Sequence, residues 1–521
     1  MAVLEVGEHG SRRELDFAGL ALAARRWEQR LRELGVRAGE PVAYQLANTL
    51  EFVAISAGIM RLGAVCEPLM PIFRERELRF MLRESAARVL VVPAEHRGYD
   101  HAAMAGRLRD ELPGLEHVLV LADGGEAPGP EPPPGPEPPP GPEPPPGPEH
   151  PPGPELSSGP RPAMTAQLLF TSGSTGEPKG VLHTHASLNL AAAMHIRHFG
   201  LSDADVIYIP SPLAHQTGFL YGMWIALALG ATQVLQVRWD AEAGFDAMRE
   251  TGSSFVQAAT PFLADLVAVA RSRGERPGAL RLFVATGAAI PRALAREARA
   301  ALGAEVGGAF GTTESCLGAA FVPGQDPELA WSTDGRALEG VRLRVTDDRG
   351  RELQPGEEGN FEVLTPTLFE GYLNRPELTA QALTADGYYR TGDLARIDAD
   401  GYLHITGRVK DVINRGGEKV PVVEVEQVLY AHPSVREVAI VAMPDERLGE
   451  RACAFVVLEP GCELDFEQMQ RHLQAQHVSK PYWPERLELV SELPKTPSGK
   501  IQKFLLRERI AAELERKAVT R

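Results

Sequence analysis

The sequence has few cysteines, and their spacing suggests neither a metal site nor a disulfide framework. The 521 residues contain four cysteines, and no two of them form a Cys-x-x-Cys pair. The N-terminus also lacks the basic stretch and apolar stretch of a secretory signal. We therefore expect a protein of the reducing cytoplasm, without disulfides or structural zinc.

Long apolar runs and a basic surface are missing as well. The longest apolar run, residues 219–237, is interrupted by Gly222, Gly230 and Gln233, which favours a buried helix followed by a strand over a membrane span. The formal net charge is −16, whereas nucleic acids and anionic membranes require a basic footprint. We expect no nucleic acid partner and no membrane span.

Proline is distributed very unevenly along the chain. Residues 126–155 contain 17 of the 43 prolines and six glutamates, but no Lys or Arg. Proline removes the backbone donor, so this six-residue Pro/Gly/Glu repeat forms neither a helix nor a central strand, and it lacks the glycine period of collagen. We predict a disordered or polyproline-II loop. A surface spacer is favoured over the alternative, a PxxP ligand such as residues 133–136.

Outside this loop, helical and strand patterns alternate. Residues 20–34 have helical periodicity, and short continuous apolar runs are typical of strands buried in a parallel sheet. These runs cover residues 88–92, 117–121, 206–209 and 282–285. We predict an α/β fold with a large N-terminal domain, residues 1–407, whose mixed or parallel sheets are flanked by helices. A smaller α+β domain follows, residues 408–521.

A loop rich in hydroxyls and glycines is the strongest local signal. Residues 168–181 read LLFTSGSTGEPKGV. Glycines let backbone N–H groups converge on phosphate oxygens, while Ser, Thr and Lys add donors and charge. The loop is not a Walker motif, because no G-x-x-x-x-G-K-[ST] string occurs. Short Ser/Gly/Thr strings also occur in flexible turns, so the signal depends on the complete string.

The string TSGSTGEPKG, residues 171–180, resembles the signature loop of the adenylate-forming superfamily, which includes acyl- and aryl-CoA synthetases, adenylation domains of peptide synthetases and beetle luciferase. Further motifs follow in the family's order over nearly the whole chain: PLAH at 212–215, GAFGTTE at 308–314, YRTGD at 389–393, GRVKD and NRGGEK within 407–419, and PKTPSGK at 494–500. The resemblance implies a small C-terminal domain that is mobile. It also implies a two-step ligation, in which a carboxylate and ATP give an acyl-adenylate and a thiol, usually that of coenzyme A, then displaces AMP.

The resemblance assigns nucleotide binding to residues on several loops. These are Thr171, Ser172, Gly173, Ser174, Thr175, Gly176 and Lys179 at the phosphates, Gly287, Ala288, Ala309, Phe310, Gly311 and Thr312 near the adenine, Thr313 at the α-phosphate, and Asp393 with Arg408 at the ribose. Phe310 replaces the family's usual Tyr, and a phenylalanine can still stack on the adenine. The alternative interpretation is that Phe310 only fills the hydrophobic core. The implied ligands of Mg²⁺ are Glu314 and Thr175, since hard oxygen donors suit that ion.

Catalytic, hinge and thiol-binding roles are also implied by the resemblance. The implied catalytic residues are Lys500, Thr175, Glu314 and His215. Lys500 would bridge the substrate carboxylate and the α-phosphate, a role that fits a point-charge ammonium. Lys410 falls at the hinge between the domains. Coenzyme A would use Gly416, Gly417 and Glu418 after the small domain rotates.

The acyl group and its acceptor are less clearly indicated. Candidate pocket residues are His215, Phe219, Met223, Gln257, Ala258, Gly287 and Thr312, and the Phe and Met beside small residues suggest an apolar pocket for a ring or a medium chain. For His215, a structural role at the end of a loop is the alternative. The chain resembles cyclohexanecarboxylate-CoA and related medium-chain or aryl acid ligases. Alternatives are another acceptor, such as a carrier-protein thiol or nitrite on an aryl amine, and a non-catalytic Pro-rich scaffold.

Overall fold

The structure of the chain, a computed structural model, describes residues 1–7, 11–121, 162–171, 178–287, 290–416, 418–496 and 499–519. The predicted disordered loop at residues 126–155 lies outside this range. In the described part, no helix is long and apolar enough to cross a membrane. The apolar run at residues 219–237 forms helical turns and then a strand, as predicted: η2 (Phe219–Trp224), α7 (Ile225–Leu229) and β12 (Thr232–Gln236).

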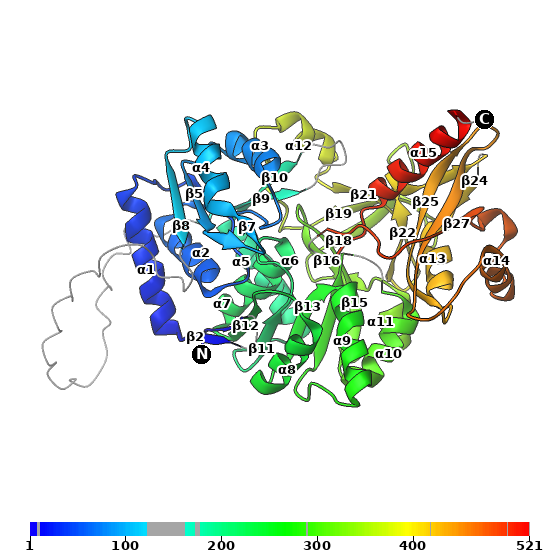
Figure 1. Ribbon diagram of the computed structural model, residues 1–521, viewed down its shortest axis with the longest axis horizontal. Helices are drawn as coiled ribbons and strands as arrows, with labels where there is room; N and C mark the ends of the chain where they lie inside the picture. Colours follow the sequence, from blue (N-terminus) through cyan, green and yellow to red (C-terminus); the bar gives the residue numbers. More distant parts are fainter. Residues whose placement is uncertain are drawn as a thin grey trace, which may run out of the picture.

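The short apolar runs form two sheets in the N-terminal part (Figure 1). One sheet has the order β17 (Arg336–Ala337), β16 (Cys316–Ala320), β15 (Glu305–Thr312), β14 (Leu282–Thr286), β13 (Phe255–Ala259), β11 (Val206–Ile209), β12, β1 (Val3–Val6) and β2 (Arg12–Leu15). The other has the order β20 (Gly371–Tyr372), β10 (Lys179–Thr184), β9 (Thr165–Thr171), β4 (Val65–Pro68), β3 (Pro41–Tyr44), β5 (Val89–Pro93) and β8 (His117–Leu121). β5 pairs with β8 in parallel, and β13 pairs with β14 in parallel.

Helices pack on these sheets around one large hydrophobic core and two smaller clusters. The large core contains Phe52 and Ile55 of α2, Leu188 and Phe199 of α5, and strand residues from both sheets. The helices of this part are α1 (Phe17–Glu33), α2 (Leu50–Leu62), α3 (Glu75–Ser85), α4 (His101–Glu111), α5 (His185–Phe199), α6 (Gln216–Gly218), α8 (Ala241–Thr251), α9 (Thr260–Arg273), α10 (Arg292–Leu302), α11 (Pro327–Ser332) and α12 (Pro376–Ala382). The hairpin of β6 (Glu95–His96) and β7 (Tyr99–Asp100) precedes α4.

An antiparallel sheet continues this part toward the C-terminus. It has the order β18 (Arg342–Thr346), β19 (Gly359–Leu364), β21 (Tyr389–Ile397) and β22 (Leu403–Arg408), and its residues Phe361 and Leu403 belong to the large core. A short 3₁₀ turn, η3 (Val409–Asp411), then leaves this sheet. The chain thus leaves the large core immediately after β22.

The remaining residues form a smaller α+β unit with its own cores (Figure 1, orange to red). Its sheet contains β24 (Glu418–Val420), β23 (Ile413–Arg415), β26 (Gly449–Leu458), β25 (Val435–Asp445) and β27 (Arg486–Leu489). Its helices are α13 (Val422–Tyr430), α14 (Phe466–Ala475), η4 (Lys480–Tyr482) and α15 (Lys503–Val519). The predicted α/β fold, with a large mixed-sheet part and a smaller α+β part, is confirmed, and we keep Arg408 as the proposed boundary.

Candidate active site

A large cleft lies between the N-terminal part and the small C-terminal unit, with a volume of about 2510 Å³. Its walls include the ends of β14, β15 and β21, the η3 turn, and the start of α15. Several predicted site residues come from these segments: Ala309, Phe310, Gly311 and Thr312 of β15, Asp393 of β21 and Lys410 of η3. The cleft therefore brings together motifs that lie far apart in the sequence.

Asp393 is a buried carboxylate in the wall of the cleft, with a side chain that is only 3% exposed. Its Oδ1 atom accepts a hydrogen bond of 2.9 Å from Nε of Arg408, its cross-strand neighbour on β22. Its Oδ2 atom is buried and has no partner among the described residues. Burial raises the pKa of Asp393, although Arg408 and Lys500 oppose this. A buried acceptor without a partner is suited to a ligand that donates, such as a pair of ribose hydroxyls.

Glu314 also lines the cleft and is oriented by an aromatic neighbour. Its Oε1 atom accepts a hydrogen bond of 2.8 Å from the hydroxyl of Tyr372. The Nζ atom of Lys179 lies 4.7 Å from the centre of the Tyr372 ring. The described residues contain no group of three or more His, Cys, Asp or Glu side chains that could hold a metal ion. A single carboxylate fits Mg²⁺ nevertheless, because that ion is usually bound by one or two carboxylates together with substrate phosphates.

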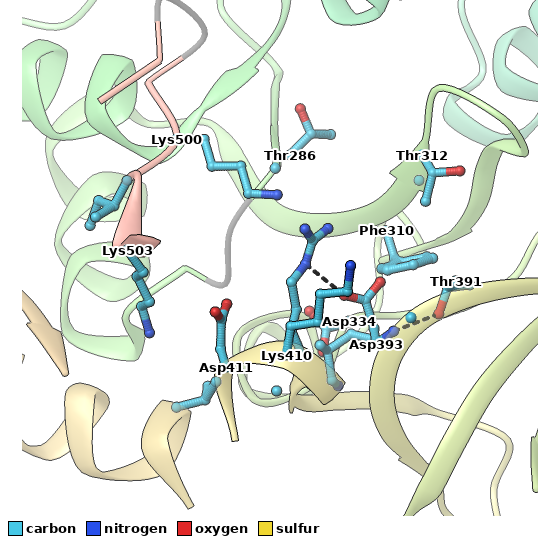
Figure 2. A pocket seen from close by; sticks show the side chains of 18 of the residues that line it. Thr286, Phe310, Thr312, Asp334, Thr391, Asp393, Lys410, Asp411, Lys500 and Lys503 are labelled. Atoms are coloured by element: carbon cyan, nitrogen blue, oxygen red, sulfur yellow. Dashed lines mark hydrogen bonds and ion pairs between the residues drawn. The ribbon is translucent and has the colours of Figure 1, made fainter. Parts of the chain in front are cut away.

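Lys500 reaches the cleft from a loop of the small unit. Its backbone N–H donates to Oγ1 of Thr496 at 3.0 Å, and its carbonyl accepts from the N–H of the same residue at 2.8 Å. Gly499 has a φ of +86° and packs against Pro261 of α9, where a Cβ atom would lie 3.3 Å from Cγ of that proline. Figure 2 shows the Lys500 side chain extending into the cleft on the side where Asp393 lies. The loop thus directs an ammonium group into the large domain.

The pKa of Lys500 is lowered to about 8, first by burial and then by the charge of Arg408. The carboxylates of Asp393, Asp411 and Glu314 act in the opposite direction. Burial and the nearby Arg408 charge both disfavour the ammonium form, so a bound anion beside Nζ would stabilise it.

His215 precedes the short helix α6 and lines the cleft. Its Nδ1 atom accepts a hydrogen bond of 3.2 Å from the backbone N–H of Thr217. Burial and the charge of Lys500 lower the pKa of His215 to about 4, so the ring is neutral at pH 7 and carries its proton on Nε2. Gly218 is required for this turn, because a Cβ atom there would lie 2.3 Å from the carbonyl oxygen of Pro212.

The segment around Phe310 forms another wall. The Phe310 ring contacts the edge of Phe361, with ring centres 5.0 Å apart and an angle of 74° between the planes. The cleft is also lined by Gly287, Ala309, Gly311, Thr312 and Thr313. The carbonyl of Thr313 accepts a hydrogen bond of 2.6 Å from Nε2 of the buried His183. The aromatic face and small neighbours leave room for a flat ring.

The phosphate loop is described only at its ends. Thr171 and Lys179 pair across β9 and β10 and both line the cleft. The predicted residues between them, Ser172, Gly173, Ser174, Thr175 and Gly176, lie outside the described residues, as do Ala288 and Gly417. Their predicted roles stay predictions, including that of Thr175 as a metal ligand.

Several predicted pocket residues are buried away from the cleft. Phe219, Met223, Gln257 and Ala258 do not line it. Phe219 and Met223 belong to the hydrophobic core, and Oε1 of Gln257 accepts a hydrogen bond of 2.5 Å from Nε2 of His195. Their contact with an acyl group stays a prediction.

Gln216 and Tyr221, which follow His215 in the same helical segment, line the cleft instead. No motif marked them, since helical sequence alone does not tell which face meets a cavity.

The predicted hinge and thiol-binding residues lie on the small unit's side. Lys410 is in the η3 turn and lines the cleft, and its carbonyl accepts a hydrogen bond of 2.8 Å from Nη1 of Arg507 on α15. The same Arg507 atom lies 2.7 Å from Oδ1 of Asp411. Gly416 is in the exposed turn between β23 and β24 and does not line the cleft. The thiol-binding prediction for Gly416, Gly417 and Glu418 therefore requires a different placement of the small unit.

The chain matches known proteins over nearly its whole length. Residues 2–373 match the AMP-binding enzyme family, and residues 424–500 match the AMP-binding enzyme C-terminal domain. The chain is 35% identical over 481 residues to a medium-chain fatty-acid–CoA ligase of Escherichia coli (strain K12), which covers 92% of this chain and 83% of the relative. It is 32% identical over 506 residues to a salicyl-AMP ligase / salicyl-S-ArCP synthetase of Mycobacterium tuberculosis (strain ATCC 25618 / H37Rv), which covers 96% and 86%.

A solved structure supports the same assignment. The anthranilate CoA ligase AuaEII, in complex with anthranoyl-AMP, superposes with a TM-score of 0.85 and 27% identity over 98% of this chain and 94% of that one. The chain therefore belongs to the AMP-binding, adenylate-forming family of ligases, and the resemblance inferred from its motifs is confirmed.

Proposed function

We propose that this enzyme joins a carboxylic acid to the thiol of coenzyme A through an acyl-adenylate made from ATP. The observation that carries the proposal is the meeting of Lys500 with Asp393 and Glu314 in one cleft, from both parts of the chain. A cation, a buried acceptor and a hard oxygen ligand are the groups that adenylation requires. The E. coli relative and the anthranilate enzyme are both CoA ligases.

In this mechanism each residue acts on a different part of the reactants. Asp393, oriented by Arg408, accepts hydrogen bonds from the ribose hydroxyls, and Phe310 stacks on the adenine. Thr171 and Lys179 contact the phosphates. Glu314 would hold Mg²⁺, which would neutralise phosphate charge. Lys500 donates to the attacking carboxylate and the α-phosphate, so it stabilises the negative charge that gathers as the new bond forms.

The test is pyrophosphate release from ATP over a panel of carboxylic acids, with and without coenzyme A. We expect release that depends on the acid, and an acyl-CoA product when coenzyme A is present. Absence of release with every acid would contradict adenylation, and would favour a non-catalytic scaffold. Release without any acyl-CoA would contradict the proposed acceptor.

A carrier-protein thiol is the second candidate acceptor. The M. tuberculosis relative is a salicyl-S-ArCP synthetase, so a related enzyme of similar length forms a thioester other than a CoA ester. Purified carrier proteins bearing a phosphopantetheine thiol should be compared with coenzyme A at equal thiol concentration. The thiol that reacts with the higher kcat/KM is then assigned as the acceptor.

Replacing Lys410 with proline should separate the two steps. Lys410 lies in a 3₁₀ turn, whose backbone φ is close to the value that proline imposes. We expect adenylate formation to persist and thioester formation to fall, because proline removes the freedom to rotate at the proposed hinge. Lys410→Ala is the matched control, since it removes the side chain but keeps the backbone free. An unchanged thioester rate in Lys410→Pro would contradict the hinge.

Raising the pH should reduce adenylation through the loss of the Lys500 proton. The pKa of Lys500 is lowered to about 8, so the charged form dominates below this pH and is lost above it. We expect kcat/KM for ATP, which reports on the free enzyme, to fall about tenfold per unit above pH 8. In Lys500→Arg any residual activity should lack this fall, since arginine stays charged. A flat wild-type profile between pH 7 and 10 would contradict the assignment.

A further inference from the structure

Asp334 is a carboxylate in the wall of the cleft that lies outside every motif and has no role in the mechanism above. Its backbone N–H donates to the carbonyl of Leu403 at 2.7 Å. Its Oδ2 atom accepts a hydrogen bond of 2.7 Å from the backbone N–H of Ile405. Both partners belong to β22, so the side chain is held in place before any ligand binds.

The other oxygen of this carboxylate is available to a ligand. Oδ1 has no hydrogen-bond partner among the described residues, and it is not one of the unpaired atoms that the surrounding protein encloses. The residue is partly exposed and lines the cleft. A group bound in the cleft can therefore reach Oδ1, whereas Oδ2 is already paired.

Asp334 and Asp393 are attached to the same strand at different points. Arg408 of β22 holds Asp393, whereas the N–H of Ile405, three residues earlier, holds Asp334. A strand rises about 3.3 Å per residue, so these two points are about 10 Å apart. The two hydroxyls of a ribose are on adjacent carbons and cannot span this separation. A ligand that pairs with both carboxylates therefore has a further donor beyond its ribose.

The charges in the cleft place Asp334 beyond Asp393 as seen from Lys500. Lys500 and Arg408 act on the pKa of Asp393, whereas Asp393 and His404 act on that of Asp334. Figure 2 shows the two carboxylates near each other. The proposed mechanism has the α-phosphate at Lys500 and the ribose at Asp393, so the next part of the nucleotide along this line is the base.

The Asp334 carboxylate accepts hydrogen bonds at pH 7. Burial raises the pKa of Asp334 to about 6, while the N–H of Ile405 and the charge of His404 oppose this rise and the charge of Asp393 adds to it. The ionised form therefore predominates at pH 7, and an ionised carboxylate is an acceptor only. The group bound at Oδ1 must then be a donor. Adenine presents its exocyclic amine at the ring edge, whereas guanine and hypoxanthine have a carbonyl there.

We propose that Oδ1 of Asp334 accepts a hydrogen bond from the exocyclic amine of adenine, and that this residue makes the enzyme select ATP over nucleotides with a carbonyl at that position. The inference rests on the function proposed above, which supplies the phosphate and ribose positions. Phe310 would contact the face of the base, but a ring face is common to all purines. Asp334 contacts the edge, where purines differ.

The selectivity is tested by the binding of nucleoside monophosphates, which needs neither an acid nor turnover. Titration calorimetry gives the Kd of the enzyme for AMP, for IMP and for purine riboside monophosphate, which has a hydrogen in place of the amine. We expect AMP to bind about tenfold more tightly than either analogue, because the charged acceptor loses its donor in both. Equal Kd values, or no binding of AMP, would overturn the inference. Pyrophosphate release is measured separately, so the failure of this inference is distinguishable from that of the proposed function.

Asp334→Asn reverses the polarity of the contact and keeps the size of the side chain. The amide oxygen accepts the hydrogen bond from the N–H of Ile405, so the amide NH₂ group takes the place of Oδ1. We expect the preference for AMP over IMP to fall by about tenfold or more, because a donor now meets the amine of AMP and pairs with the carbonyl of IMP.

Asp326→Asn is the matched control for this variant. The Asp326 carboxylate caps α11 outside the cleft, and asparagine caps a helix equally well, so the preference for AMP should not change. An unchanged preference in Asp334→Asn, with thermal unfolding like that of the wild type, would overturn the inference.

Discussion

Lys500→Ala is expected to lower the rate of acyl-adenylate formation by roughly 10²- to 10³-fold, as when a preorganised charge stabiliser is removed. The side chain enters the cleft from the small unit (Figure 2), where the charges of Asp393, Asp411 and Glu314 act on it. In the proposed mechanism, its charge is needed only while the carboxylate attacks the α-phosphate. Thioester formation from a preformed acyl-adenylate should therefore remain close to the wild-type rate.

The two half-reactions should be measured separately, as pyrophosphate release and as acyl-CoA formation from synthetic adenylate. Lys503→Ala is the matched control. Lys503 is close in sequence, but its Nζ atom lies 2.6 Å from Glu426 Oε1 in an ion pair on the small unit. We expect this control to retain adenylation. Equal losses in both half-reactions of Lys500→Ala would show that the lysine serves the structure of the domain rather than the first step.

Asp393→Asn is expected to lower kcat/KM for ATP by roughly 10- to 150-fold, mainly through a higher KM. The substitution keeps the size of the side chain but removes the charge that pairs with Arg408 and would accept from the ribose. Hydrogen bonds to charged groups contribute about 1.5–3 kcal/mol, which corresponds to this range. Unlike Lys500→Ala, this variant should impair both half-reactions, since the adenylate still carries the ribose.

Deoxy nucleotides provide the control for this second prediction. If Asp393 binds the ribose hydroxyls, wild type should lose activity with 2′-deoxy-ATP or 3′-deoxy-ATP, and Asp393→Asn should lose less on the same change. The difference between these two losses, expressed as a free energy, measures the coupling between the Asp393 carboxylate and the ribose hydroxyl. If Asp393→Asn loses as much activity as wild type does with both analogues, then Asp393 does not bind the ribose hydroxyls.

Much of the fold was predictable because it depends on local pattern. The apolar run at residues 117–121 predicted a strand buried in a parallel sheet. β8 does pair with β5 in parallel, but the predicted burial was wrong, because β8 lies at the edge of its sheet and Val120 is exposed. The interruptions at Gly222 and Gly230 predicted that the run beginning at Phe219 is not a membrane span, and it forms helical turns and a strand. Periodicity and turn residues act over a few positions, so a single sequence contains this information.

The pocket wall could not be predicted in the same way. Phe219 and Met223 are predicted pocket residues, but they belong to the hydrophobic core, while Gln216 and Tyr221 line the cleft. These residues lie within one helical segment that includes the π-helical turn η2, so the facing direction depends on the wider turn and on what packs behind it. Neither effect can be read from residue types.

The sequence by itself determined the family and the kind of chemistry, because motifs such as TSGSTGEPKG and PKTPSGK carry the required residue types in contiguous strings. Only the tertiary structure decided which of these groups meet. Lys500 and Asp393 belong to different parts of the chain, and their meeting depends on how the small unit packs against the large one. The place of Asp334 in the cleft wall likewise emerges only from packing, because its residue type does not tell which backbone group holds one oxygen and leaves the other to a ligand.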